Sequence, residues 1–270
     1  MKKILAVVTL LLALVLAGCG GNTETPAEEG KTAIKVGATP LPHAEILKVA
    51  QPILAEDGIE LEIVEFTDYT TPNLSLNDGS IDANFFQHQP YLDDFNAKQG
   101  SNLTSIAKIH FEPMGLYSKK VQSVEELKEG ATIGIPGDAT NGGRALVVLE
   151  NAGLIKLKEG VGITATVRDI VEKKVEVMEM EAAQLPRSLE DLDGAVINGN
   201  YAVEADLTPA DALVSEDAQS EAAETFGNVL VVKEGGEERE ELKKLAEVLQ
   251  SDDVKKFIEE TYQGAVIPTF

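Results

Sequence analysis

A strand followed by a turn and a helix occurs twice in this chain, about a hundred residues apart, and this restricts the fold more than any other feature. The first copy begins with the apolar segment Ile34–Ala38, continues through the turn Pro40–Pro42, and reaches an amphipathic helix over His43–Ala55. A further strand is expected at Glu60–Phe66. The order strand, helix, strand predicts parallel pairing of the two strands with a right-handed crossover.

The second copy begins with the apolar segment Ala131–Ile135, which leads through a Gly-rich turn into a helix expected over Gly143–Asn151. Ser123–Glu126 fits a capping box for a helix that lies just before this strand. Later elements are predicted as strands at Val175–Met180, Gly194–Ile197 and Val229–Lys233, and as amphipathic helices at Glu237–Leu249 and Asp252–Tyr262. Two separate openings favour two α/β lobes over one long sheet, with a ligand cleft between them at the carboxyl ends of strands.

The N-terminus has the layout of a secretory signal peptide. Lys2 and Lys3 precede the apolar run Ile4–Leu16, and the small residues Ala17 and Gly18 lead to Cys19. The run is too short to cross a bilayer, which needs roughly 20 apolar residues. We therefore predict a signal peptide over residues 1–18.

Cys19 is the only cysteine of the chain, and it lies where a lipoprotein signal places the residue that is acylated and becomes the new N-terminus. The alternative is a chance thiol or a small buried apolar residue. Residues 19–32 are then the lipidated cysteine and a flexible tether, rich in Gly, Asn, Thr, Glu and Pro. The expected location is the extracytoplasmic face of the cell membrane, and no disulfide can form within the chain.

The charge of the chain narrows the choice of partner. Removal of residues 1–18 takes away Lys2 and Lys3 and leaves 21 basic against 46 acidic residues, a net charge of −25. Such a surface argues against nucleic acid and anionic lipid headgroups as partners, and indicates a solvated acidic coat.

One candidate site is the turn Gly137–Gly143, which follows a strand and opens a helix that carries Arg144 in its first turn. Free backbone N–H groups and the positive end of the helix dipole favour an anion there. Arg144 could bind a carboxylate through a bidentate pair, or it could simply pair with a nearby acid. The turn lacks the Gly-Lys-Ser/Thr ending of a Walker motif.

A second candidate is the segment Phe85–Tyr91, which mixes rings with Gln and His in a chain that is only 5% aromatic, with Tyr69 upstream. Such a mixture suits an apolar pocket with a few polar points. The alternative is that the phenylalanines and His88 belong to the core. A metal site is not predicted, because His43 and His110 lack ligand spacing with His88.

Two Asn-containing turns complete the set: Asn198-Gly199-Asn200 follows one strand, and Phe226-Gly227-Asn228 precedes another. Neutral amides can donate to a carboxylate and accept from an ammonium, although ordinary turns also favour Asn. No nucleophile elbow, zinc-protease motif or further cysteine supports an enzyme or a cofactor.

These residues together resemble the MetQ/NlpA family of lipoproteins, the substrate-binding components of methionine-import ABC transporters. The matching segments run almost end to end: Leu16–Cys19, Ile34–Gly37, Asp68-Tyr69, Gly79–Asn84, Phe86–His88, Pro90–Asp93, Tyr117–Lys120, Thr140-Asn141, Gly143-Arg144, Gly153–Lys158, Gln184–Leu189, Ala195–Asn198 and Asn228. The resemblance implies a periplasmic-binding-protein-like (type II) fold, methionine or a close analogue as ligand, and an ABC permease and ATPase as partners.

The resemblance also implies roles for single residues. Arg144 would grip the ligand carboxylate with Asn141 beside it, and Asn198 and Asn228 would hydrogen-bond the amino-acid backbone. The side-chain pocket would be walled by Tyr69, Phe86, His88 and Tyr91. The role of Asn200 and the choice between L-methionine, D-methionine and a methionine-containing dipeptide stay open.

The expected lobes are residues 33–116 plus 226–270 and residues 117–225, joined by two crossings that act as a hinge. Two alternatives to methionine import remain: a receptor of the same fold for another small ligand, and a surface adhesin or structural lipoprotein.

Overall fold

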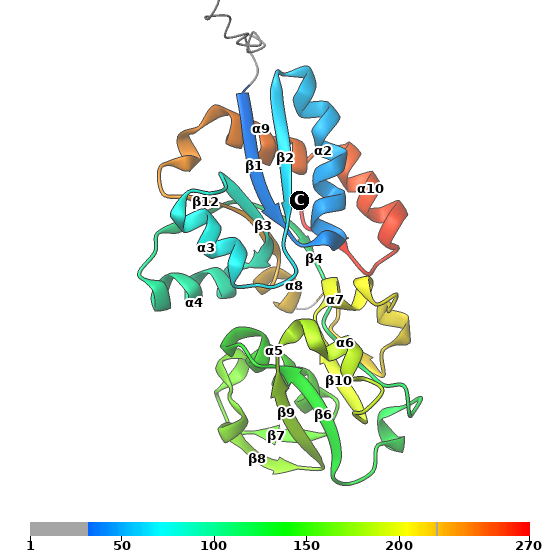
Figure 1. The fold of residues 1–270 in the computed structure, drawn as a ribbon. Helices are drawn as coiled ribbons and strands as arrows, with labels where there is room; N and C mark the ends of the chain where they lie inside the picture. The colour runs from blue at the N-terminus through cyan, green and yellow to red at the C-terminus, as the bar shows by residue number, and fades with distance from the viewer. Residues whose placement is uncertain (1–31, 220) are drawn as a thin grey trace, which may run out of the picture. The chain divides into compact units, whose positions relative to one another are not determined.

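Two β-sheets, each covered by helices, make up the computed structural model, which describes residues 32–219 and 221–270 (Figure 1). The predicted signal peptide, Cys19 and the tether up to Lys31 lie outside these residues. Among the described residues no helix has the length and apolar character needed to span a membrane.

The first sheet has six strands in the order β13-β4-β12-β3-β1-β2. Their bounds are β1 (Thr32–Ala38), β2 (Ile59–Glu65), β3 (Ala83–His88), β4 (Leu103–Phe111), β12 (Asn228–Lys233) and β13 (Ile267–Pro268). β1 pairs in parallel with β2, Thr32 opposite Ile59, and also with β3, whereas β12 runs antiparallel to β3 and β4. The predicted parallel pairing of the first two strands is confirmed.

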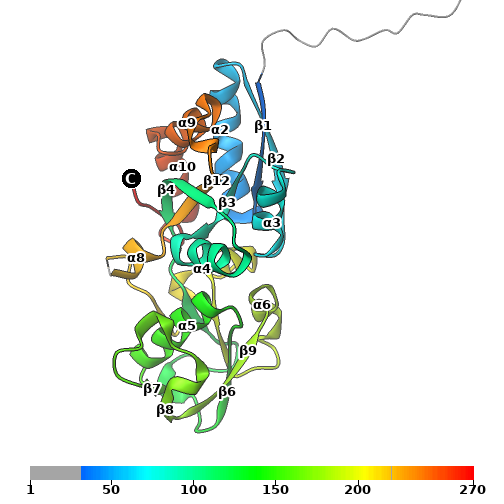
Figure 2. The same ribbon diagram turned by 90° about the vertical axis from the view of Figure 1, so that its left-hand side faces the viewer.

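Helices cover both faces of this sheet (Figure 2). One face carries α2 (Glu45–Glu56), α9 (Glu240–Leu249) and α10 (Asp252–Tyr262), and the other carries α3 (Thr71–Asp78) and α4 (Gln89–Gln99). β12 shows why: Leu230 and Val232 pack into the first core, while Val229 and Val231 pack into the second. Successive side chains of a strand point to opposite faces, so an unbroken apolar strand needs cover on both.

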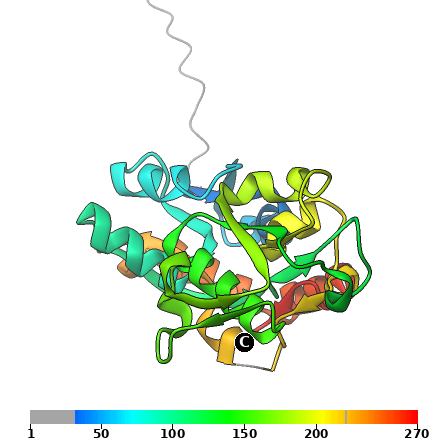
Figure 3. The same cartoon turned by 90° about the horizontal axis from the view of Figure 1, so that it is seen from below.

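The second sheet has five strands in the order β11-β5-β10-β6-β9 and lies nearest the viewer in Figure 3. The strands are β5 (Gly115–Tyr117), β6 (Ala131–Pro136), β9 (Val175–Met180), β10 (Gly194–Ile197) and β11 (Val214–Ser215). Helix α5 (Ala139–Asn151) packs on one face, with the hairpin β7 (Ile155–Leu157) and β8 (Ile170–Lys173) beside it. The other face carries α6 (Leu185–Ser188) and α7 (Gly199–Glu204). The expected two-lobed α/β architecture is confirmed.

The chain passes between the sheets twice. The first crossing, residues 112–114, joins β4 to β5, and the second, residues 216–227, joins β11 to β12 and includes α8 (Glu221–Thr225). The expected boundary between residues 116 and 117 falls inside β5. The limits of the lobes and the hinge remain a prediction.

Two local predictions need correction. The helix of the second opening begins at Ala139 rather than Gly143, because the Asp138 side chain accepts a hydrogen bond from the Asn141 backbone N–H at 2.9 Å and caps the helix earlier. The capping box at Ser123–Glu126 does not form. Glu126 instead accepts from the Gln122 N–H, and the element is a three-residue 3-10 turn, Val124–Glu126.

Candidate functional site

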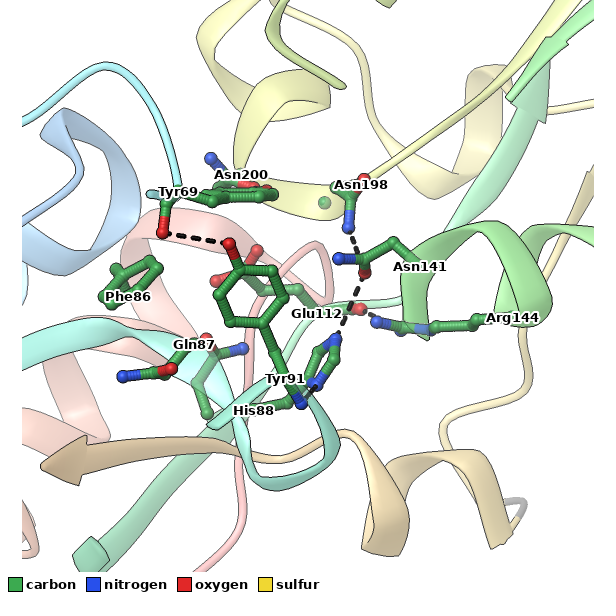
Figure 4. A pocket seen from close by; sticks show the side chains of 12 residues that line it. Tyr69, Phe86, Gln87, His88, Tyr91, Glu112, Asn141, Arg144, Asn198 and Asn200 are labelled. Atoms are coloured by element: carbon green, nitrogen blue, oxygen red, sulfur yellow. Dashed lines mark hydrogen bonds between the residues drawn. The ribbon is translucent and has the colours of Figure 1, made fainter. Parts of the chain in front are cut away.

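All eight binding residues singled out from the sequence line one pocket (Figure 4). The complete lining is Tyr69, Phe86, Gln87, His88, Tyr91, Glu112, Asn141, Arg144, Asn198, Gly199, Asn200 and Asn228. The cavity between them measures about 20 Å³. That is room for about one water, so a larger ligand requires the lining to move apart.

Three rings form one side of the pocket, and we call Tyr69, Phe86 and Tyr91 the aromatic wall. Their centroids lie 5.9–6.0 Å from one another, and the Tyr91 hydroxyl donates to the Tyr69 carbonyl at 3.0 Å. Phe86 belongs to β3, in which every residue is buried, so the strand fixes the wall against the sheet. The wall offers apolar faces and ring edges to a ligand side chain.

His88 connects this side of the pocket to the opposite side. Its Nδ1 accepts from the Tyr91 backbone N–H at 3.2 Å and caps α4, so its Nε2–H is free to donate to Asn141 Oδ1 at 3.1 Å. The same oxygen accepts from Asn198 Nδ2 at 2.7 Å. Burial, and then the charge of Arg144, lowers the pKa of His88 to about 3, so the ring is neutral at ordinary pH.

Arg144 lies on α5, and its side chain is 4% exposed. Its Nε and Nη2 donate to the two carboxylate oxygens of Glu216 at 2.8 and 2.5 Å, and Nη2 also donates to the Glu112 carbonyl at 2.9 Å. The guanidinium carbon lies 4.3 Å from the centroid of the Phe226 ring. Arg144 therefore lines the pocket and is paired with an acid, and its contact with a ligand carboxylate remains a prediction.

The same contacts tie the two crossings together. Glu112 belongs to the first crossing and Glu216 to the second, and the Met114 N–H donates to Glu216 Oε2 at 2.8 Å. Arg144 thus holds both connecting segments in addition to facing the pocket.

The glycines before Arg144 have a packing role. A Cβ on Gly143 would lie 2.1 Å from the Ile163 carbonyl oxygen, so only glycine allows α5 to approach the turn Gly162–Thr164 this closely. The Asp138 carboxylate itself receives the Asn141 N–H at the start of the helix. The binding of an external anion at this helix end remains a prediction.

The sequence reasoning missed a group of buried residues, His43, His110 and Glu112, which we call the histidine–glutamate cluster and of which Glu112 lines the pocket. Their potential ligand atoms all lie within 4.8 Å of one another. His110 Nε2 lies 2.7 Å from Glu112 Oε1, a hydrogen-bond distance, and His43 Nε2 lies 3.4 Å from the same oxygen and 3.1 Å from Asn228 Oδ1. The expectation of no metal remains a prediction.

Spacing along the chain could not reveal this cluster, because the fold brings His43, which lies just before α2, next to His110 and Glu112 at the end of β4. The available signal was chemical: His110 and Glu112 are polar residues that alternate with apolar Ile109 and Phe111 where β4 ends. Burial lowers the pKa of His43 to about 4 and of His110 to about 3, and burial raises the pKa of Glu112.

Asn200, whose role the sequence left open, also lines the pocket and is 3% exposed. Tyr69 donates its hydroxyl proton to Asn200 Oδ1 at 2.5 Å, a contact between a loop of the first sheet and α7 of the second. The Tyr69 and Tyr201 rings lie 5.0 Å apart beside it. Asn200 is therefore a pocket residue.

Comparison with known proteins gives a consistent result. The chain matches the NlpA lipoprotein family model over residues 34–270. It is 41% identical to the D-methionine-binding lipoprotein MetQ of Salmonella typhimurium, covering 98% of this chain and 97% of the relative, and 40% identical to the methionine-binding lipoprotein MetQ of Bacillus subtilis, covering 99% of each.

A solved structure of a nutrient-binding protein from Burkholderia cenocepacia bound to methionine superposes with a TM-score of 0.84 at 40% identity, covering 88% of this chain and 100% of the other. The resemblance seen in the sequence is thereby confirmed over nearly the whole chain. This protein belongs to the NlpA lipoprotein family.

Proposed function

We propose that this protein captures methionine or a close analogue and delivers it to an ABC importer. The observation that carries the proposal is the convergence of an aromatic wall, a guanidinium and several amides on one buried pocket. Two relatives at about 40% identity are named for methionine binding, and a similar structure holds methionine. The relatives are named as binding proteins, and we propose no catalytic step.

The chemistry of the pocket suits this ligand. A thioether contacts aromatic rings favourably by about 0.3–1.5 kcal/mol, and the aromatic wall supplies three rings. Arg144 would bind the ligand carboxylate with Asn141 beside it. The Nε and Nη2 groups of Arg144 already donate to Glu216 and Glu112, so Nη1 is the group that would reach the ligand. Asn198 and Asn228 would hydrogen-bond the amino-acid backbone.

Ligand access would follow from movement of the lobes. Because the pocket has room for about one water, the lobes, residues 33–116 plus 226–270 and residues 117–225, would open at the two crossings and close on the ligand. Contacts to both lobes favour the closed state by differential affinity. An acylated Cys19 would hold the receptor on the extracytoplasmic face, beside the permease and its ATPase.

Calorimetric titration tests this function. The full-length protein, purified in detergent and then unfolded and refolded to remove carried-over ligand, is titrated with L-methionine, D-methionine and Gly-Met. We expect one-to-one binding of at least one of them, with leucine as the matched ligand that binds more weakly. A folded sample that gives no heat with any of the three would exclude the proposed function.

A further inference from the structure

Glu112 is the one carboxylate among the twelve residues that line the pocket in the described part of the chain. It is 5% exposed, and its backbone carbonyl accepts from Arg144 Nη2 at 2.9 Å. The pocket lining therefore contains one carboxyl group and one guanidinium group, on residues in direct contact. Neither residue spacing nor the family resemblance singled out Glu112.

The hydrogen-bond partners of the Glu112 carboxylate are neutral. His110 Nε2 donates at 2.7 Å, His43 lies at 3.4 Å, and the Asn200 backbone N–H also hydrogen-bonds to it. Both imidazoles are buried and uncharged at neutral pH. The nearby cation, Arg144, is already engaged with both oxygens of Glu216. Glu112 is thus a desolvated acid held in position by neutral hydrogen-bond partners, while the nearby cation that acts on it is paired directly with another acid.

We propose that Glu112 recognises the ammonium group of an amino-acid ligand, while Arg144 recognises its carboxylate. The inference rests on the proposed function and deepens it, because it assigns the ligand class as an α-amino acid zwitterion. An ammonium would pair with Glu112 directly and form a charge-assisted hydrogen bond in a site shielded from water. Asn198 Oδ1, a buried acceptor without a partner among the described atoms, lines the same pocket and offers a second contact.

His43 and His110 are positioning residues in this account. A hydrogen bond of 2.7 Å between Thr39 Oγ1 and His43 Nδ1 fixes the His43 ring. His110 hydrogen-bonds directly to Glu112 Oε1. Gly199 allows the start of α7 to approach, since a Cβ there would lie 2.5 Å from the Glu112 Cβ. The carboxylate is therefore confined between β4 and α7.

The test compares two ligands that differ only in the ammonium group, L-methionine and 4-(methylthio)butanoate, on the full-length protein and on Glu112→Gln. Glu112→Gln should weaken methionine binding by at least about tenfold and leave binding of the des-amino analogue almost unchanged. Glu129→Gln, which changes an exposed glutamate that does not line the pocket, is the control and should leave both affinities unchanged.

Equal weakening of both ligands by Glu112→Gln would show a purely structural role and overturn the inference, as would unchanged methionine binding. If the variant does not fold, the wild type still provides a test: equal affinities for methionine and the analogue would show that no group recognises the ammonium and would overturn the inference. Failure of both ligands to bind the folded wild type would instead count against the proposed function itself.

Discussion

The two sheets contribute different chemistry to the pocket. The first sheet and its loops supply the aromatic wall, His88 and Asn228, and the second supplies Asn141, Arg144, Asn198 and Asn200. The three histidines of the chain, His43, His88 and His110, are also all on the first-sheet side.

The difference lies in how the groups are positioned. On the first-sheet side, β3 is buried along its whole length, so its rings are fixed by packing on both faces. On the second-sheet side, the polar groups come from the N-terminal parts of α5 and α7 and are held by hydrogen bonds. We therefore expect changes in the aromatic wall to alter side-chain preference, and changes in Asn141, Arg144 or Asn198 to alter binding of the amino-acid head group, to which Asn228 at the start of β12 also contributes.

The largest effect is expected from Arg144→Ala. Loss of the guanidinium removes the proposed contact with the ligand carboxylate, and truncation of one side of a buried charge pair costs about 2–5 kcal/mol of binding. It also leaves the part-buried Glu216 without its ion-pair partner. Titration with methionine should show a loss of affinity of about 30-fold or more. Arg187→Ala, at an exposed arginine of α6, is the matched control. An unchanged dissociation constant would remove Arg144 from the site.

Acid should destabilise the first-sheet side. Burial lowers the pKa of His43 to about 4 and those of His88 and His110 to about 3, below the unfolded value of 6.5. Between these values the unfolded chain binds more protons, so stability is fully present above pH 6.5 and falls as the pH is lowered, by roughly 1–2 kcal/mol per histidine at pH 5. Glu112, whose pKa is raised by burial, acts in the opposite direction.

Urea unfolding at pH 7 and pH 5 measures this dependence. The free energy of unfolding should be lower at pH 5 than at pH 7. His88→Gln should reduce this difference by roughly 1–2 kcal/mol, the contribution expected from one histidine. A stability that is unchanged or higher at pH 5 would contradict the prediction.

The sequence predicted most of what depends on local pattern. The segments that became β1, β6, β9, β10 and β12 were identified as strands because apolar residues predominate or alternate in them, and α10 matches its predicted bounds. The eight pocket residues were also identified, partly from chemistry and partly from family resemblance.

What the sequence could not show depends on distant contacts. Glu112 lines the pocket and Glu216 is the partner of Arg144 because the chain crosses twice between the sheets and Arg144 lies against both crossings. Helix α5 begins at Ala139, earlier than predicted, because the Asp138 side chain within the Gly-rich turn caps the helix. Such partners are determined by tertiary packing and leave no periodic signal in the sequence.

A smaller effect is expected from Tyr69→Phe, which tests the link between the two sides. The substitution removes the hydroxyl that donates to Asn200 Oδ1 across the pocket, and a hydrogen bond of this kind contributes about 0.5–1.5 kcal/mol. The ligand-free protein should unfold at a lower urea concentration while the aromatic wall is kept. Tyr117→Phe is the comparison, since that tyrosine does not line the pocket. Equal losses of stability in the two variants would mean that the hydrogen bond between Tyr69 and Asn200 does not stabilise the ligand-free protein specifically.

The smallest effect, and the sharpest test of the division between the sheets, is expected from Phe86→Leu. Leucine keeps an apolar side chain but removes a ring of the aromatic wall, and a sulfur–aromatic contact contributes about 0.3–1.5 kcal/mol. The ratio of methionine to norleucine affinity should therefore fall, because norleucine replaces the sulfur with a methylene and keeps the same head group. Arg144→Lys should weaken both ligands and leave that ratio unchanged, since it alters only head-group binding. A ratio that responds to Arg144→Lys and not to Phe86→Leu would show that the two sheets do not divide recognition in this way.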